Sequence, residues 1–208
     1  MDLNNILFPA PEYIVQNIEA HEGEVIFIPK PKSNIKQDSC LSKKELMQYI
    51  PCLLLQSKYY KKLSRNFLIF FHGNAEDIFL SRDIAEKICS TMCINVLVVE
   101  YPGYSIYQEE KDSSKLLEDC VTVFDFLTET LKVAEDNIFV IGRSIGTAPA
   151  LYLSSCRKPA SLVLMSPFTS IRAVVQNMVG NLLKYLISER YKNIIYLFSS
   201  SLILDLTI

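Results

Sequence analysis

The sequence predicts an α/β fold in which helices cover both faces of a mainly parallel sheet. Short apolar segments alternate with longer segments of helical character along the 208 residues. The strongest apolar segments, 67–71 and 94–99, are continuous rather than alternating, as strands buried on both faces must be. A Gly-x-Ser-x-Gly run at 142–146 separates an apolar segment from a helical one. Half of the residues are apolar, so a chain of this length can bury the core of one domain.

Four short apolar segments in the first half of the chain are predicted strands: 24–28, 50–56, 67–71 and 94–99. A polar stretch at 30–44 separates the first two strands and is expected to be a loop. Residues 77–90 predict a helix between the last two strands. The apolar side chains of this helix fall near one face: Ile78, Ile84, Ala85 and Ile88.

The same alternation continues in the second half of the chain. Asp112 or Ser113 can cap a long helix. Its apolar residues recur at close to the helical period: Leu116, Leu117, Cys120, Val121, Phe124, Leu127 and Leu131. Two further buried strands are predicted at 137–141 and 161–165, with a helix that begins at Thr147 between them. A last helical stretch is expected at about 171–187.

The run Gly142-Arg143-Ser144-Ile145-Gly146 indicates a nucleophile elbow, a tight turn that presents a serine between a strand and a helix. Small residues are required at the two glycines because the strained serine backbone brings neighbouring chain too close for a Cβ. The alternative is a glycine-rich turn with an incidental serine. The strand before the run and the helix after it favour the elbow, with Ser144 as the nucleophile. Arg143 is expected to form a salt bridge or a surface contact.

The loop after the strand at 67–71 carries a second motif, His72-Gly73-Asn74. A serine hydrolase stabilises its oxyanion with two backbone N–H donors, one after the nucleophile and one from this earlier loop. We therefore predict Ile145 and Asn74 as the two donors. Gly73 lets the backbone approach the substrate, and His72 is expected to brace the loop by hydrogen bonding rather than to act as the base. The alternative for His72 is an ordinary histidine at a strand end.

The turn after the strand at 94–99 contains Tyr101, Gly103 and Tyr104. Because it follows this strand, the turn is expected to shape the rim of the same pocket. The alternative is an ordinary Pro-Gly turn, and the motif taken alone favours this alternative.

Composition excludes several classes of function. A net charge of −2 provides no basic surface for nucleic acid. No apolar run is long enough to cross a bilayer and residues 1–10 lack the pattern of a signal peptide, so we expect a cytoplasmic location that allows peripheral membrane contact. The six cysteines are scattered, and Cys89 and Cys93 have no nearby histidine or cysteine partner, which favours reduced core cysteines over a metal pair. We expect no metal and no cofactor, and the oligomeric state stays open.

Several segments of the chain resemble the α/β-hydrolase domain-containing protein 17 subfamily and its close relatives. In chain order they are Leu7 to Pro11 with Tyr13, His72 to Ala75, Tyr101 to Tyr104, Gly142 to Thr147, and Ser166 to Ser170. The resemblance covers roughly residues 6–193. It implies an α/β-hydrolase fold and serine-dependent hydrolysis of esters or thioesters. In the best-known members this activity removes palmitate from protein cysteines at membranes, so the implied substrate is a small molecule or an acylated protein.

The chain departs from that subfamily at both ends. Its members carry a cysteine cluster near the N-terminus for lipid attachment, whereas this chain has no cysteine before Cys40. They also continue with further strands, helices, an acid-bearing loop and a histidine-bearing loop. We therefore expect residues 1–194 to form a partial α/β-hydrolase domain that lacks the last strands and helices, followed by an atypical apolar tail at 195–208.

The catalytic triad is incomplete in this sequence. Its two histidines, His21 and His72, both precede Ser144, and Asp205 is a poor substitute for the triad acid. Loss of the histidine costs a triad enzyme about 10⁶ in turnover, so such a chain is expected to be nearly inert. Three interpretations stay open: a shortened form of an active serine hydrolase, a catalytically inactive module that binds an acyl ligand or a protein, and a chain whose histidine comes from a second chain.

The apolar tail has a predicted structural role. A sheet that stops at the strand 161–165 would expose a hydrophobic edge, which is a template for aggregation. Residues 194–198 or 202–206 can add a substitute strand at that edge, because both runs are apolar.

Overall fold

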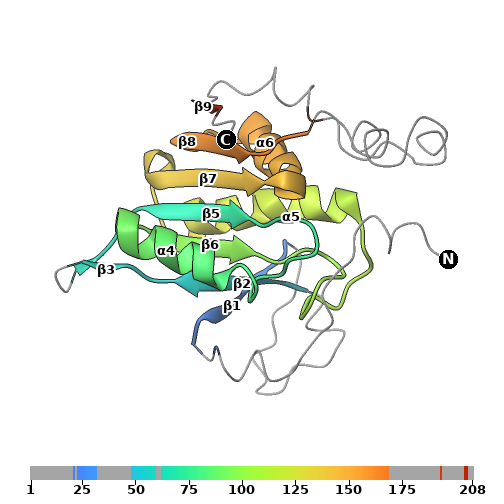
Figure 1. Cartoon of the computed structure of the whole chain (residues 1–208), viewed down its shortest axis with the longest axis horizontal. Helices are drawn as coiled ribbons and strands as arrows, with labels where there is room; N and C mark the ends of the chain where they lie inside the picture. Colours follow the sequence, from blue (N-terminus) through green and yellow to red (C-terminus); the bar gives the residue numbers. More distant parts are fainter. Residues whose placement is uncertain are drawn as a thin grey trace.

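The computed structural model describes residues 21, 23–31, 48–59, 62–168, 193 and 204–205, and a seven-stranded sheet forms its centre (Figure 1). Along the described chain the strands of this sheet are β1 (Val25–Pro29), β2 (Tyr49–Leu55), β5 (Phe67–Phe71), β6 (Asn95–Val99), β7 (Ile138–Arg143), β8 (Ser161–Met165) and β9 (Leu204–Asp205). The described helices beside it are α4 (Arg82–Met92), α5 (Ser113–Asp125) and α6 (Thr147–Cys156). The short strands β3 (Lys58–Tyr59) and β4 (Lys62–Leu63) pair separately. The predicted α/β class is confirmed.

The strand order is β1-β2-β6-β5-β7-β8-β9. β2 pairs antiparallel with both β1 and β6, and every pair from β6 to β9 is parallel. Phe71 lies opposite Val99 on one side and Gly142 on the other. The loops that follow β5, β6 and β7 therefore leave the sheet at one edge, which is where parallel sheets place their ligand sites.

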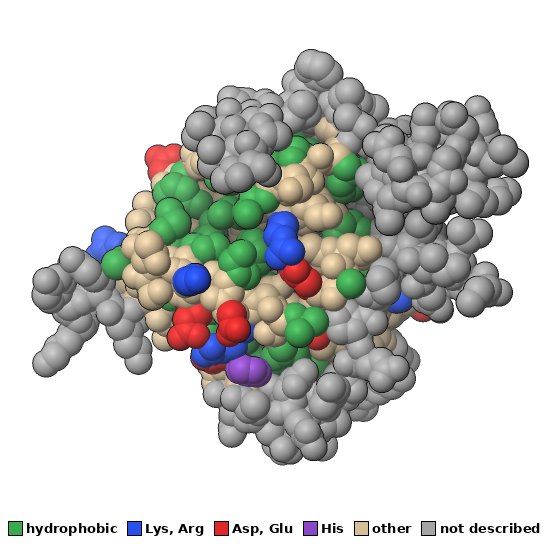
Figure 2. Space-filling model, viewed as in Figure 1, with side chains coloured by type: hydrophobic (Ala, Val, Ile, Leu, Met, Phe, Trp, Pro, Cys, Tyr) green, Lys and Arg blue, Asp and Glu red, His purple; other side chains and the backbone are tan. Residues whose placement is uncertain are grey.

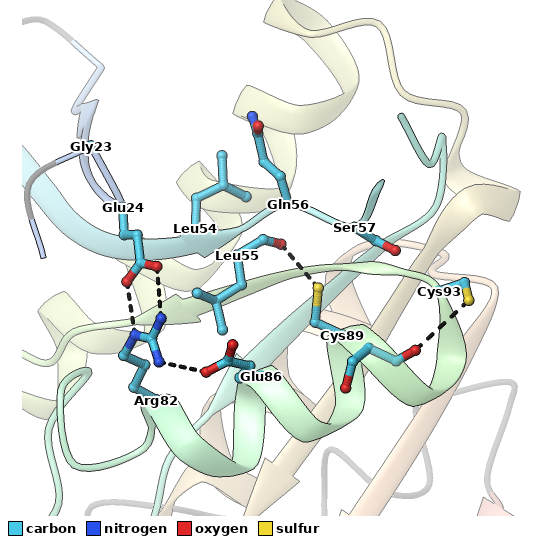
Figure 3. A pocket seen from close by; sticks show the side chains of 11 residues that line it. Gly23, Glu24, Leu54, Leu55, Gln56, Ser57, Arg82, Glu86, Cys89 and Cys93 are labelled. Carbon is cyan, nitrogen blue, oxygen red and sulfur yellow. Dashed lines mark hydrogen bonds and ion pairs between the residues drawn. The ribbon is translucent and has the colours of Figure 1, made fainter. Parts of the chain in front are cut away.

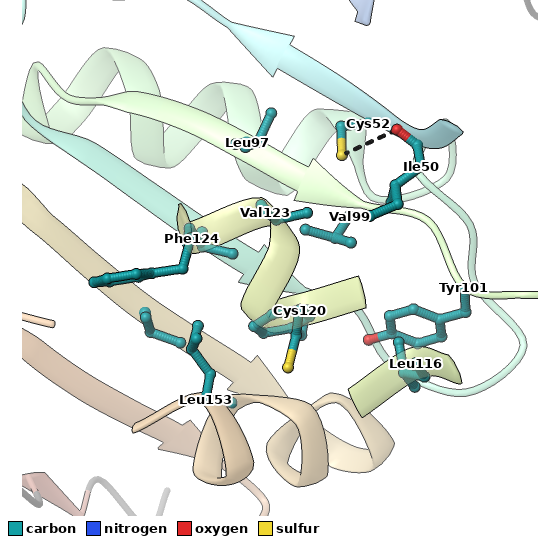
Figure 4. Close-up of a cluster of buried hydrophobic side chains, with 14 of the residues drawn as sticks. Ile50, Cys52, Leu97, Val99, Tyr101, Leu116, Cys120, Val123, Phe124 and Leu153 are labelled. Carbon is teal, nitrogen blue, oxygen red and sulfur yellow. Dashed lines mark hydrogen bonds between the residues drawn. The ribbon is translucent and has the colours of Figure 1, made fainter. Parts of the chain in front are cut away.

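The hydrophobic core divides into two clusters, one on each face of the sheet. The first packs α4 against side chains of β2, β5 and β6, among them Leu53, Phe70 and Val98. The second packs α5 and α6 against the alternate side chains of the same strands. Figure 4 shows part of this second cluster, in which Cys120 of α5 lies between Leu153 of α6 and Leu116, and Leu116 lies beside Tyr101. Helices thus cover both faces, as the continuous apolar strands require.

Most predicted boundaries hold to within one or two residues, and α4 is the main correction. Its predicted start was residue 77, but the helix begins at Arg82. The Asp77 carboxylate accepts the backbone N–H groups of Phe79 and Leu80 at 3.0 and 2.7 Å, which holds this stretch in a turn instead. The predicted cap of α5 is confirmed, because Asp112 accepts the backbone N–H of Ser114 at 2.8 Å.

The predicted substitute strand is confirmed for two residues. β9 pairs parallel with β8, and Val163 lies opposite Leu204. The alternative strand at 194–198, the helix predicted at 171–187 and residues 32–44 of the predicted loop lie outside the described residues.

A buried carboxyl group at α5 gives a pH-dependent stability. Asp119 accepts the Tyr107 hydroxyl at 2.6 Å and lies 3.8 Å from Lys30 Nζ. Burial raises the pKa of Asp119 to about 6, although the Tyr107 hydrogen bond and the Lys30 charge lower it in part. The folded protein therefore holds this proton more tightly than the unfolded chain does. Stability from this group is present at low pH and is lost as the pH rises towards 6.

We expect Asp119→Asn to remove this dependence while its amide oxygen keeps the Tyr107 hydrogen bond. Between pH 4.5 and 7.5 the unfolding free energy of the wild type should fall relative to that of the variant by about 2 kcal/mol. Urea denaturation followed by circular dichroism at both pH values measures the difference. Parallel pH profiles for the two proteins would rule out this role for Asp119.

Candidate active site

Ser144 lies at the sharp turn that the sequence predicts. It follows the last residue of β7 with a φ of +52° and begins a short 3-10 turn, Ser144–Gly146, that runs directly into α6. A positive φ is costly for a residue with a side chain and is common at functional sites. The Thr147 hydroxyl donates to the Ser144 carbonyl oxygen at 2.6 Å and secures the turn. The predicted order of strand, elbow and helix is confirmed.

Packing explains why Gly142 and Gly146 flank the serine. A Cβ at Gly142 would lie 2.4 Å from the Gly146 carbonyl oxygen and 2.7 Å from the Thr147 Cα. A Cβ at Gly146 would lie 2.3 Å from the carbonyl oxygen of Phe71. These distances are far inside van der Waals contact, so the predicted need for two residues without side chains is confirmed.

The elbow packs against the His72-Gly73-Asn74 loop. The same Cβ at Gly146 would lie 2.6 Å from the His72 carbonyl oxygen, so backbone touches backbone where β5 ends. The structure thus brings together the two segments that hold the predicted oxyanion donors, the buried Ile145 and the exposed Asn74. The role of their N–H groups stays a prediction. The Gly73 N–H donates to Glu76 Oε2 at 3.2 Å and is thereby engaged.

His72 braces this loop, as predicted. Its side chain is fully buried, with Nδ1 3.0 Å from the Gly73 carbonyl oxygen and Nε2 3.2 Å from Glu100 Oε1. The ring stacks on Tyr101 with centroids 3.9 Å apart. Because both ring nitrogens already have partners, His72 offers no free nitrogen to take a proton from Ser144. The second histidine, His21, pairs with Glu24 and stacks on Phe79.

The turn after β6 forms hydrogen bonds with the His72-Gly73-Asn74 loop. The Tyr101 hydroxyl donates to the His72 carbonyl oxygen at 2.7 Å, and the Tyr104 hydroxyl donates to Asn74 Oδ1 at 3.2 Å. Both tyrosines are buried. Gly103 has a φ of +80°, which closes the turn between them. Tyr101 and Tyr104 therefore support the loop through hydrogen bonds, and their place at the rim of a pocket stays a prediction.

Two glutamates of the site were missed by sequence reasoning. Glu100 is fully buried directly after β6 and accepts the backbone N–H groups of Tyr101 and Ile78 as well as facing His72. Burial raises the pKa of Glu100, and the His72 contacts lower it in part. Glu76 joins the loop to the elbow, because its Oε1 lies 2.8 Å from Arg143 Nη2. The salt bridge predicted for Arg143 is confirmed.

A pocket of about 480 Å³ lies elsewhere, between α4 and the end of β2 (Figure 3). Arg82 lies at one end of it and binds Glu24 through two nitrogens and Glu86 through a third. In Figure 2 acidic and basic side chains accordingly lie side by side on the face that carries α4. None of the residues that line this pocket belongs to the elbow or to the His72 loop.

The thiols and acids that the structure describes form no metal centre. No group of three or more His, Cys, Asp or Glu side chains in these ranges is arranged to hold an ion. Cys52, Cys89, Cys93, Cys120 and Cys156 are all free thiols. Burial raises the pKa of the Cys52 and Cys120 thiols, as expected for inert core cysteines. Cys40 lies outside the described residues.

None of the helices within the described ranges combines the length and the hydropathy that a bilayer span requires.

Curated proteins with similar sequences are α/β hydrolases or related proteins. The α/β-hydrolase domain-containing protein aho-3 of Caenorhabditis elegans is 32% identical over 103 residues, which cover 50% of this chain and 31% of that protein. Human α/β-hydrolase domain-containing protein 17C is 31% identical over 107 residues, which cover 51% of this chain and 32% of that protein. Protein bem46 of Schizosaccharomyces pombe is 31% identical over 125 residues, which cover 59% of this chain and 41% of that protein. The matched segment thus spans less than half of each relative. No family model matches the chain.

Solved structures show the same fold. An α/β hydrolase from Vibrio vulnificus superposes with a TM-score of 0.66 at 19% identity, covering 94% of this chain and 71% of that one. A serine hydrolase homologue from Coxiella burnetii gives a TM-score of 0.52 at 14% identity, covering 70% of this chain and 63% of that one. At these identities the likeness concerns the fold alone.

Proposed function

Because the chain is an α/β-hydrolase-fold protein similar to the α/β-hydrolase domain-containing protein 17 subfamily, we propose that it is a serine hydrolase of esters or thioesters. One observation carries the proposal. Ser144 stands at a positive φ between β7 and α6, with glycines at the two positions where a Cβ would collide with backbone. A serine in an incidental turn needs neither feature, whereas a serine presented to a substrate needs both.

Ser144 Oγ would attack the acyl carbon, and the oxygen of that carbonyl would become the oxyanion. The N–H groups of Ile145 and Asn74 are the proposed donors to that oxygen, because their segments pack against each other at the carboxyl ends of β7 and β5. His72 is not the base that accepts the serine proton, because both of its ring nitrogens are engaged, and among the described residues His21 contacts Glu24 and Phe79 rather than the elbow. The nucleophile and the oxyanion loop are thus the parts of the machinery that we assign to this segment.

As the substrate we propose the acyl group of an acylated protein at a membrane, which is what the resemblance to the α/β-hydrolase domain-containing protein 17 subfamily implies. A small-molecule ester or thioester has the same reacting atoms, so Ser144 would attack either in the same way. Comparing an S-acylated peptide with a soluble thioester of the same acyl chain would separate the two substrates.

Covalent labelling tests the proposal. We expect a fluorophosphonate probe to modify the 208-residue chain slowly at Ser144, because His72, with both ring nitrogens engaged, cannot activate the hydroxyl. The Ser144→Ala variant should lose all labelling, and peptide mass spectrometry should place the adduct on Ser144. A longer product of the same gene that adds a histidine should react faster. Equal labelling of the wild type and the Ser144→Ala variant would refute the proposal.

A second function is favoured by the engagement of both ring nitrogens of His72. A module that binds an acyl ligand or an acylated protein without turnover needs the fold but not a base. Saturable binding of a fluorescent fatty acyl thioester, with the thioester recovered intact, would support this function. Absence of any binding would remove it.

A further inference from the structure

One carboxylate links the three segments around Ser144. Glu76 Oε2 accepts the Gly73 N–H at 3.2 Å and the Ser81 hydroxyl at 3.3 Å, and Glu76 Oε1 pairs with Arg143 Nη2 at 2.8 Å. Gly73 belongs to the oxyanion loop, Ser81 immediately precedes α4, and Arg143 is the residue before the nucleophile. The Glu76 carboxylate therefore fixes the loop, the start of the helix and the elbow relative to one another.

The position of this carboxylate creates an electrostatic conflict. Its bond to the Gly73 N–H places a negative charge one residue from Asn74, a proposed donor to the oxyanion. A negative charge there opposes the negative charge that develops on the substrate oxygen. The Arg143 guanidinium supplies the opposite charge at hydrogen-bonding distance, and its side chain and that of Glu76 are both only partly exposed, at 39% and 21%. Such a pair is less screened than one in open solvent.

We propose that Arg143 is a positioning residue for the oxyanion loop. It neutralises Glu76, so that Glu76 can hold the Gly73 N–H and the loop against the elbow without repelling the oxyanion. The inference rests on the proposed function for its catalytic consequence. Its structural consequence, an ordered Gly73 amide that depends on the charge of Arg143, can be measured without any turnover.

The first test is the rate at which a fluorophosphonate labels Ser144. We expect Arg143→Gln to slow labelling about fivefold, because Glu76 is left uncompensated. In the Arg143→Gln/Glu76→Gln double variant the amide oxygen can still accept the Gly73 N–H and no charge remains, so labelling should recover to within about twofold of wild type. Arg143→Lys should retain most of the rate. A double variant as slow as Arg143→Gln would overturn the role of charge.

Arg157→Gln is the matched control. Arg157 binds Asp125 through two nitrogens at 2.6 Å and is 35% exposed, but this pair joins α5 to the residue after α6. Removing it takes away an ion pair of similar exposure without touching the loop, so the labelling rate should not change.

Amide hydrogen exchange at Gly73 separates the two proposals. Arg143→Gln should speed exchange about fivefold, because the unpaired Glu76 carboxylate then turns towards solvent and releases the Gly73 N–H, and adding the uncharged Glu76→Gln should restore protection. If the wild type is never labelled but exchange follows this pattern, the proposed function fails and the positioning role stands. If exchange at Gly73 is the same in wild type and Arg143→Gln, the inference fails whatever the labelling shows.

Discussion

Gly146→Ala is expected to lower the unfolding free energy by about 3 kcal/mol or more. The new Cβ would lie 2.3 Å from the Phe71 carbonyl oxygen and 2.6 Å from the His72 carbonyl oxygen. Overpacking costs about 1 to 3 kcal/mol where side chains can move aside. Here the obstacles are backbone atoms at the end of β5, a strand paired on both sides, so the cost should reach the top of that range or exceed it.

Gly73→Ala provides the matched control for this prediction. A Cβ at Gly73 would meet only the end of the Glu76 side chain, at 3.5 Å, which is an ordinary contact. We expect a change below about 1 kcal/mol. Urea denaturation followed by circular dichroism compares the two variants with the wild type. If both alanine variants unfold at the same urea concentration, the close approach of elbow and loop is wrong.

The strands of this fold were predictable because their signal is local. Residues 67–71 and 161–165 match β5 and β8 residue for residue, and 94–99 differs from β6 by one residue. Short continuous apolar runs are typical of strands in a sheet that is covered on both faces. The start of α4 was missed for a local reason as well, since the Asp77 carboxylate stabilises a turn that the apolar spacing does not reveal.

The candidate site was predictable only in part. The turn at Ser144 and the bracing role of His72 follow from motifs whose residues are close in sequence. The partners of Glu76 and Glu100 do not, because Arg143 is 67 positions and His72 is 28 positions away along the chain. The register of β5 with β6 and β7 decides which side chain each carboxylate meets. A glutamate directly after a buried strand was the available signal for Glu100.

His72→Ala should destabilise the protein by about 3 to 5 kcal/mol, which is the usual cost of leaving one member of a buried pair alone. His72 and Glu100 are both fully buried. Removing the imidazole takes away the contact with Glu100 Oε1, the bond to the Gly73 carbonyl oxygen and the stack on Tyr101. What remains is a carboxylate with two backbone N–H donors and no side chain to share its proton.

The loss of unfolding free energy caused by His72→Ala should increase with pH. Burial already raises the pKa of Glu100, and His72 is the main influence that lowers it, so the variant raises this pKa further. A folded-state pKa above the unfolded one means that stability is lost as the pH rises. The destabilisation by His72→Ala should therefore be larger at pH 8 than at pH 5 when both proteins are unfolded in urea.

A double-mutant cycle identifies the orphaned carboxylate as the cause. Glu100→Gln removes the charge and keeps one oxygen, which can accept either the Tyr101 N–H that now binds Oε1 or the Ile78 N–H that now binds Oε2. In the His72→Ala background this second change should recover about 1 to 3 kcal/mol at pH 8, whereas in the wild-type background it should be destabilising, because the His72 contact is weakened. Additive effects of the two substitutions would mean that the imidazole acts through packing alone. In that case the stack of His72 on Tyr101, rather than the buried Glu100, would hold the His72-Gly73-Asn74 loop in place.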